Sequence, residues 1–155
     1  MNKKILFTGL AFALGCMFSM NAFSQAKPEV LVKQRQAGMT LIGKYWGPMG
    51  AMVRPKDPAP FDAAVVARNA GYLETLSKLP WDGFNASTSG EKSAALPAVF
   101  SDMAKFKTSS EEMQAAVTKL AATSKGGSEA DVKAAIGAVG KTCGGCHENF
   151  RQKAQ

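Results

Sequence analysis

Apolar residues recur at every third or fourth position in four segments of the chain, and residues that break helices separate these segments. This spacing is typical of amphipathic helices. In the first segment one face carries Leu31, Gln34, Gly38, Leu41, Tyr45 and Met49. The pattern predicts a helix that reaches Pro48 and ends before the proline-rich residues 54–60, which cannot continue a helix.

The second segment has a clear start and a clear stop. Asp62 is a good N-cap, because its carboxylate can accept a hydrogen bond from a free backbone N–H of the first turn. Leu79 precedes Pro80, and the residue before a proline is disfavoured in the helical region. We therefore predict a helix from Asp62 to Leu79, followed by a loop over residues 81–96.

The third and fourth segments complete an all-α pattern. The third segment has apolar or small residues at Val99, Met103, Phe106, Ser110, Met113, Val117 and Leu120, and it stops at Gly126 and Gly127. Ser128 can cap the fourth, whose face carries Val132, Ile136, Val139, Cys143, Cys146 and Phe150. No alternating run predicts a strand. Four helices with short links predict an antiparallel four-helix bundle.

Residues 1–24 are typical of a signal peptide that is cleaved on export. Lys3 and Lys4 precede an apolar run, and residues 22–24 form a small-x-small cleavage site. A lipoprotein anchor at Cys16 is the alternative, but the apolar run continues past this cysteine. We expect a mature domain of residues 25–155 in the periplasm. Nothing after residue 25 is apolar for long enough to predict a membrane span.

Composition limits the partners of the mature chain. With 155 residues in all, the chain is long enough for one domain with a core. Loss of Lys3 and Lys4 reduces the formal net charge from +7 to +5. The remaining basic residues are scattered along the helices without an arginine-rich block, so we expect no nucleic-acid partner.

The candidate cofactor-binding residues lie near the C-terminus, in the sequence Cys143-Gly144-Gly145-Cys146-His147. On a helix, Cys146 and His147 follow Cys143 by three and four positions, so the three side chains share one face. Cys-x-x-Cys-His is the attachment motif for c-type haem. The thiols form thioethers to the porphyrin and the imidazole ligates the iron. We interpret the two glycines as allowing the porphyrin close to the backbone.

Other interpretations of the motif fit less well. A structural zinc site needs four protein ligands, whereas the mature chain offers two cysteines and one histidine. A thioredoxin-type pair follows a strand, and a helix precedes this motif. A disulfide between Cys143 and Cys146 would be strained and would close almost no loop. Export agrees with haem, because c-type haem is attached outside the inner membrane.

The position of the motif limits the second axial ligand of the iron. Only eight residues follow His147, which is the only histidine of the chain. A second ligand must therefore come from upstream, and the candidates are a methionine, a lysine or none.

Two segments of the chain carry a resemblance to a known family. One is residues 140–153, "GKTCGGCHENFRQK", on the last of four helices, and the other is residues 33–39, "KQRQAGM", on the first. In both segments the chain resembles cytochrome c′ and its class II relatives. "APFDAAVV", residues 59–66, supports the likeness, which covers essentially the whole mature chain. The proline-rich link of residues 54–60 is longer than in the usual pattern of the family. The resemblance implies a four-helix bundle with one covalently attached haem c.

The resemblance also implies roles for residues around that haem. Cys143 and Cys146 would be the thioether positions, His147 the iron ligand and Arg151 the basic residue beside it. Arg35 and Gln36 match a pair near a haem propionate. Met39 matches the residue that covers the distal face of the iron, where it acts either as a lid, the role that we favour, or as a sixth ligand.

These assignments predict a carrier or a gas binder. A five-coordinate iron under an apolar lid binds nitric oxide or carbon monoxide, whereas a low-spin iron ligated by His147 and Met39 suits electron transfer. A gas-sensing or gas-sequestering module is the alternative, and a metal-binding bundle without haem is a third interpretation. We expect no enzymatic turnover, since no general acid is placed for it. Gly43 and Gly47 would let another helix approach closely, either in internal packing or in the homodimer that the resemblance implies, and the redox partner is not identified by the sequence.

Overall fold

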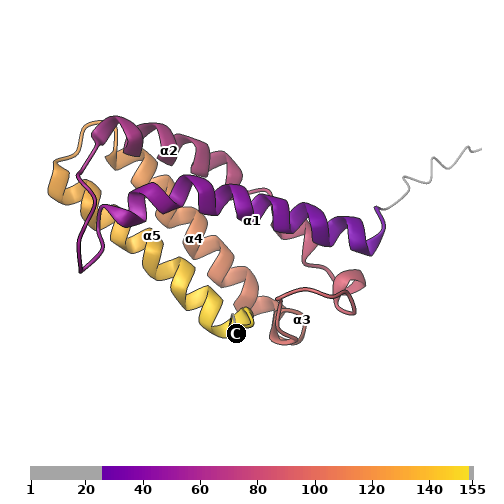
Figure 1. The fold of residues 1–155 in the computed structure, drawn as a ribbon. Coiled ribbons are helices and arrows are strands. Elements are labelled where there is room, and N and C mark those ends of the chain that lie inside the picture. The colour runs from indigo at the N-terminus through magenta and orange to yellow at the C-terminus, as the bar shows by residue number, and fades with distance from the viewer. Residues whose placement is uncertain (1–25, 154–155) are drawn as a thin grey trace, which may run out of the picture.

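The computed structural model describes residues 26–153. Within this range the helices are α1 (Pro28–Ala51), α2 (Ala63–Leu76), α3 (Ala98–Ser101), α4 (Met103–Thr123) and α5 (Glu129–Phe150), with short 3₁₀ turns η1 (Trp81–Gly83) and η2 (Ala86–Thr88). The four long helices, α1, α2, α4 and α5, form the antiparallel four-helix bundle that the pattern predicts (Figure 1). None of the helices described combines the length and hydropathy of a membrane span. The predicted signal peptide lies outside the described residues.

Side-chain caps fix the starts of the helices where the sequence predicts them. The Asp62 carboxylate accepts a hydrogen bond from the backbone N–H of Val65, and the Ser128 hydroxyl accepts one from Asp131. Each bond satisfies a backbone donor that the first turn of a helix leaves free. The end of α2 differs from the prediction, because the helix stops at Leu76 and the chain continues to Leu79 in tighter turns.

The predicted third helix is divided in two. Asp102 has φ −127° and ψ 58°, outside the helical region, and it separates the single turn of α3 from α4. Its carboxylate accepts a hydrogen bond from the backbone N–H of Lys105, which starts α4. The helical spacing of apolar residues continues on both sides of Asp102, so this spacing alone did not reveal the break between α3 and α4.

The face of α1 that is buried differs from the predicted face by about one residue. Val32, Arg35 and Met49 are buried, whereas Leu41 is 42% exposed. The prediction followed apolar side chains and therefore left out the buried arginine. Met49 is the position that the predicted and the observed faces share.

The apolar core consists of two clusters. The larger one joins α1, α2, α4 and α5 and includes Met49, Leu73, Leu120 and Ile136. The smaller one consists of Val99, Phe106 and Phe150, where α3, α4 and α5 meet the chain that follows η1. Cys143 packs against the first cluster and Cys146 against the second. The two cysteines therefore lie where the two parts of the core meet.

Candidate functional site

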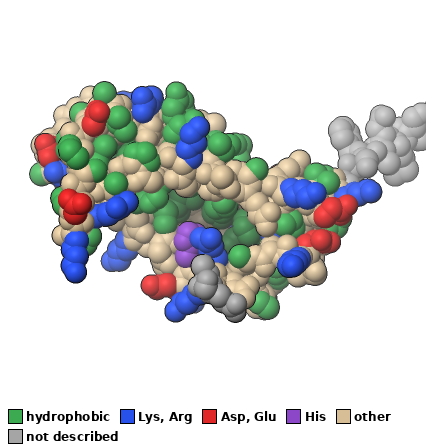
Figure 2. Space-filling model, viewed as in Figure 1, with side chains coloured by type: hydrophobic (Ala, Val, Ile, Leu, Met, Phe, Trp, Pro, Cys, Tyr) green, Lys and Arg blue, Asp and Glu red, His purple; other side chains and the backbone are tan. Residues whose placement is uncertain are grey.

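A cavity of about 750 Å³ opens between α1, α4, α5 and the chain that follows η1. Figure 2 shows the hollow in the surface, with apolar side chains inside it and the purple histidine at its edge. This volume is within the range of sites for cofactors and small molecules. Its lining includes all seven site residues that the sequence predicts: Arg35, Gln36, Met39, Cys143, Cys146, His147 and Arg151.

The three residues of the motif reach the cavity from the last two turns of α5. Both cysteines are free thiols and partly buried. Burial raises the pKa of both thiols, and the neighbouring Cys146 raises that of Cys143 further. Burial also lowers the pKa of His147, and the positive charge of Arg151 adds to this effect. A neutral imidazole is the form that can ligate a metal.

The glycines inside the motif do not need to be small for the protein to pack. Gly144 and Gly145 are exposed, and a Cβ atom added to either would meet no other part of the protein within 4 Å. Neither residue lines the cavity. The interpretation that they let a porphyrin approach the backbone stays a prediction.

Arg35 is a buried cation, only 3% exposed. Its Nη1 donates to the Gly83 carbonyl at 2.6 Å and to the Thr88 hydroxyl at 2.8 Å, and its Nη2 donates to Ser93 Oγ at 3.0 Å. The guanidinium also lies 4.3 Å from the ring centroid of Phe84. Burial lowers the pKa of Arg35, but a guanidinium stays protonated in proteins.

No carboxylate neutralises this cation within the described residues, where the ion pairs are Lys107–Glu111 and Lys133–Glu129. A guanidinium carries five N–H donors, and the three hydrogen bonds above leave two of them free. A buried charge without a counter-ion is costly. Because Arg35 lines the cavity, an anionic group of a bound molecule is the partner that would complete its environment.

Gln36 and Met39 also line the cavity from α1. Gln36 is exposed at the edge of the helix, and Met39 is half-buried. Met39 follows Arg35 by four residues, so both side chains project from the same side of α1. The structure therefore places a thioether and a guanidinium on one wall of the cavity, as the resemblance implies.

Aromatic side chains form a part of the cavity that sequence reasoning missed. Trp81 and Phe84 line it from residues predicted only as a loop, and Trp46 lines it from α1. The Trp81 indole donates to the Ser77 carbonyl at 2.6 Å, and the ring centroids of Phe84 and Phe106 lie 4.9 Å apart. Two large aromatic residues in an otherwise polar loop are the signal that could have identified this wall.

The end of α5 is fixed by backbone hydrogen bonds. The backbone N–H of Arg151 donates to the His147 carbonyl at 3.1 Å, and Arg151 pairs with Ala95 in an isolated antiparallel bridge. On either side of the bridge, Leu96 donates to the Phe150 carbonyl and Gln152 to the Ala94 carbonyl, at 2.9 and 2.8 Å. Residues 94–96 thus hold the segment that carries His147 and Arg151.

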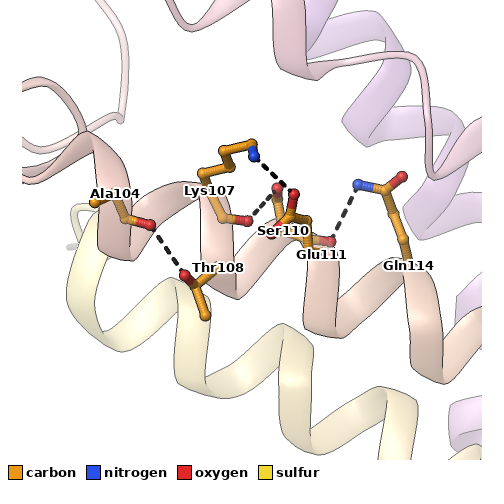
Figure 3. A network of polar contacts seen from close by, with 6 residues as sticks. All are labelled: Ala104, Lys107, Thr108, Ser110, Glu111 and Gln114. Carbon is orange, nitrogen blue, oxygen red and sulfur yellow. Dashed lines mark hydrogen bonds and ion pairs between the residues drawn. The ribbon is translucent and has the colours of Figure 1, made fainter.

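Helix α4 forms another wall of the cavity with Phe106, Ser109 and Met113. Its polar side chains bond mostly within the helix itself, as Figure 3 shows for Thr108 with Ala104, Gln114 with Ser110, and the ion pair of Lys107 with Glu111. These contacts satisfy polar groups without using another element. The cavity side of α4 is left mainly apolar.

The residues present fit a haem. Two thiols and an imidazole from one helix suit thioether attachment and iron ligation. The aromatic and apolar lining suits a flat, largely apolar macrocycle. The buried guanidinium of Arg35 has two free N–H groups and no carboxylate partner in the described part of the chain, so it suits a propionate.

Comparison with known proteins points to one family. The family model described as Cytochrome C' matches residues 30–151. The cytochrome c' of Rubrivivax gelatinosus is 44% identical over 128 residues, which are 82% of this chain and 98% of that protein. Among solved structures, cytochrome c prime from Shewanella frigidimarina has a TM-score of 0.76 and 34% identity, with 83% and 98% of the two chains covered. The nitric oxide complex of a point mutant of cytochrome c prime from Alcaligenes xylosoxidans has a TM-score of 0.73 and 40% identity, with the same coverage.

Proposed function

The chain belongs to the cytochrome c′ family, and we propose that it is a periplasmic monohaem cytochrome that transfers electrons or binds nitric oxide through an iron ligated by His147. Proteins of this family carry covalently attached haem c. The observation that carries the proposal is that Cys143, Cys146 and His147 line one cavity together with a buried cation, Arg35, for which residues 26–153 provide no carboxylate partner.

Each of these residues has a defined task in the proposal. Bound haem would supply an iron that exchanges one electron and has a coordination position for a diatomic gas. Cys143 and Cys146 would hold the group through thioethers, and the imidazole of His147 would ligate the iron. Arg35 donates its free N–H groups to a propionate, with Gln36 beside it. Burial and, to a lesser extent, the positive charge of Arg151 lower the pKa of His147, which favours the neutral imidazole that can ligate iron.

Met39 decides between the two activities. We propose that it is a lid, which leaves a site for nitric oxide or carbon monoxide, and not a ligand. The solved nitric oxide complex of the Alcaligenes xylosoxidans protein supports gas binding by this chain, because the two chains are 40% identical. The alternative is a low-spin electron carrier in which Met39 and His147 would both ligate the iron. A gas-sensing or sequestering role would use the same site as the lid proposal.

We propose no catalytic turnover at this site. The lining of the cavity contains no aspartate or glutamate within the described residues, and its one imidazole is assigned to the iron. General acid or base catalysis would need a titratable group that is free to move a proton. A carrier or binder has no such requirement.

The homodimer is also part of the proposal, with α1 at the interface. A Cβ atom added at Gly43 or Gly47 would meet nothing of the same chain within 4 Å, but Gly43 also lines the cavity, so Gly47 is the glycine that a second copy could approach. Leu41 on α1 and Tyr72 on α2 are 42% and 47% exposed. A second copy that packs on this surface would bury these side chains. The expected outcome in sedimentation is a dimer that Gly47→Trp dissociates.

Titration of the reduced protein with nitric oxide and carbon monoxide, followed in the visible spectrum, tests the proposed function. Under the lid proposal the ferrous protein is high-spin, binds nitric oxide, and binds carbon monoxide faster after Met39→Ala. A far-red charge-transfer band in the ferric protein that Met39→Ala abolishes would favour the His147–Met39 electron carrier. A protein without any haem spectrum would contradict both.

A further inference from the structure

Residues 83–96, which we term the strap, connect two walls of the cavity that are distant in the sequence. The strap itself contributes Phe84, Ser93, Ala94 and Ala95 to the lining. Apart from Gly83, which ends η1, and the short turn η2, its backbone belongs to neither a helix nor a strand. Contacts to other elements must therefore hold it in place.

One set of contacts attaches the strap to α1. The guanidinium of Arg35 bonds to Gly83, Thr88 and Ser93, which lie 48 to 58 positions away in the sequence. Gly83 lies so close to α1 that an added Cβ atom would be 2.9 Å from the Leu31 carbonyl. The same helix carries Met39, one turn after Arg35.

A second set of contacts attaches the strap to the end of α5. The bridge between Ala95 and Arg151, with its flanking hydrogen bonds, fixes the residues that follow His147. The Arg151 N–H donates in turn to the His147 carbonyl. Any shift of the strap at Ala95 would therefore act on the last turn of α5.

A single oxygen atom belongs to both sets of contacts. Ser93 Oγ accepts a hydrogen bond from Arg35 Nη2 at 3.0 Å and another from the backbone N–H of Ala95 at 3.3 Å. A continuous polar path thus runs from Arg35 through Ser93 and Ala95 to Arg151. Ser93 is half-buried, and its hydroxyl has no other assigned role in the site.

We propose that Ser93 is a positioning residue that couples Arg35 on α1 to His147 and Arg151 on α5. This inference rests on the proposed function, since it concerns how the chain holds the ligand of the iron. Ser93 sets the position of Ala95 relative to Arg35, and the bridge transmits that position to the segment after His147. The orientation of the imidazole thereby depends on a side chain that contacts neither iron nor gas.

The test compares Ser93→Ala with Ser93→Thr in the haem-loaded protein. Threonine keeps the hydroxyl, so it should preserve the coupling, whereas alanine removes it. Ser89→Ala is the matched control, because Ser89 lies in the same strap but donates only to the Ala86 carbonyl. Backbone hydrogen exchange is followed by mass spectrometry in peptides that contain Ala95 or Gln152, and the iron–histidine stretching band is recorded by resonance Raman in the ferrous protein.

Ser93→Ala should raise the rate of backbone hydrogen exchange about 5-fold in both peptides, as expected for the loss of about one net hydrogen bond. The iron–histidine band should shift in Ser93→Ala and stay at the wild-type position in Ser93→Thr and Ser89→Ala. Faster exchange confined to the Ala95 peptide, or an unshifted band in Ser93→Ala, would overturn the proposal. A wild-type protein without haem would contradict the proposed function, while exchange in the Gln152 peptide would still decide whether the strap is coupled to α5.

Discussion

The two parts of the core differ in how they are held together. Within the described residues the larger cluster contains thirteen buried apolar residues, twelve from four helices and Met52 directly after α1, and the smaller cluster contains three. The smaller cluster lies beside the cavity, where the wall is completed by the strap and the hydrogen bonds of Arg35. One end of the bundle is thus stabilised by extensive apolar burial, and the other by a small apolar cluster together with a few directed polar contacts.

This difference indicates where the fold depends on its cofactor. A cavity of about 750 Å³ removes contacts that an apolar core would otherwise provide. A bound haem would restore them and would give the Arg35 guanidinium a counter-ion. We therefore expect the larger cluster to stay folded without haem, while the strap and the end of α5 open more readily.

Leu120→Ala should have the largest effect on stability, because Leu120 is fully buried in the larger cluster. The expected loss is about 3 to 4 kcal/mol of the free energy of unfolding, from lost burial and the cavity left behind. Urea denaturation followed by circular dichroism measures it, with the exposed Leu79→Ala as control. A loss below ~1 kcal/mol would show that this cluster does not dominate stability.

Arg35→Met should have the next largest effect on stability, and this effect should be confined to the strap. The substitution removes the hydrogen bonds that Arg35 donates to the Gly83 carbonyl and to the Thr88 and Ser93 hydroxyls, at a cost of about 2 to 3 kcal/mol. Limited proteolysis should then cut within residues 83–96 before any other segment. Arg68→Met, at an exposed position of α2, is the control. Uniform cleavage along the chain would contradict a role of Arg35 in holding the strap.

Gly144→Ala should have the smallest effect, and it should be stabilising. Alanine is favoured over glycine inside a helix by about 0.8 kcal/mol, and nothing in the protein obstructs the added methyl group. In the control Gly50→Ala, the new Cβ atom would lie 3.1 Å from the Trp46 ring, so we expect a smaller gain or a loss. Thermal unfolding of the haem-free protein measures both. Loss of stability in Gly144→Ala would show that the position is constrained after all.

Local signals made much of the fold predictable. Asp62 and Ser128 start helices because a capping side chain bonds only two or three residues ahead. Cys143, Cys146 and His147 share a face because helical geometry fixes positions three and four apart. Each of these inferences needs only one turn of the chain.

The strap and the orientation of α1 could not be predicted in this way. Arg35 meets Gly83, Thr88 and Ser93 only because the bundle brings together residues about fifty positions apart. A buried arginine also interrupts an apolar stripe, which is why the predicted face of α1 included the exposed Leu41. The resemblance to a family identified Arg35 as a site residue, but it gave no indication of the strap.

The central claim is that Cys143, Cys146 and His147 hold a covalent haem in this cavity. Purification of the exported protein from cells with a working haem maturation system, followed by acid–acetone extraction, tests it directly. The account predicts that haem stays with the chain in the wild type and that the double variant Cys143→Ala/Cys146→Ala releases it into the acetone phase. A colourless wild-type protein, or wild-type haem that is extracted as completely as from the double variant, would contradict the account.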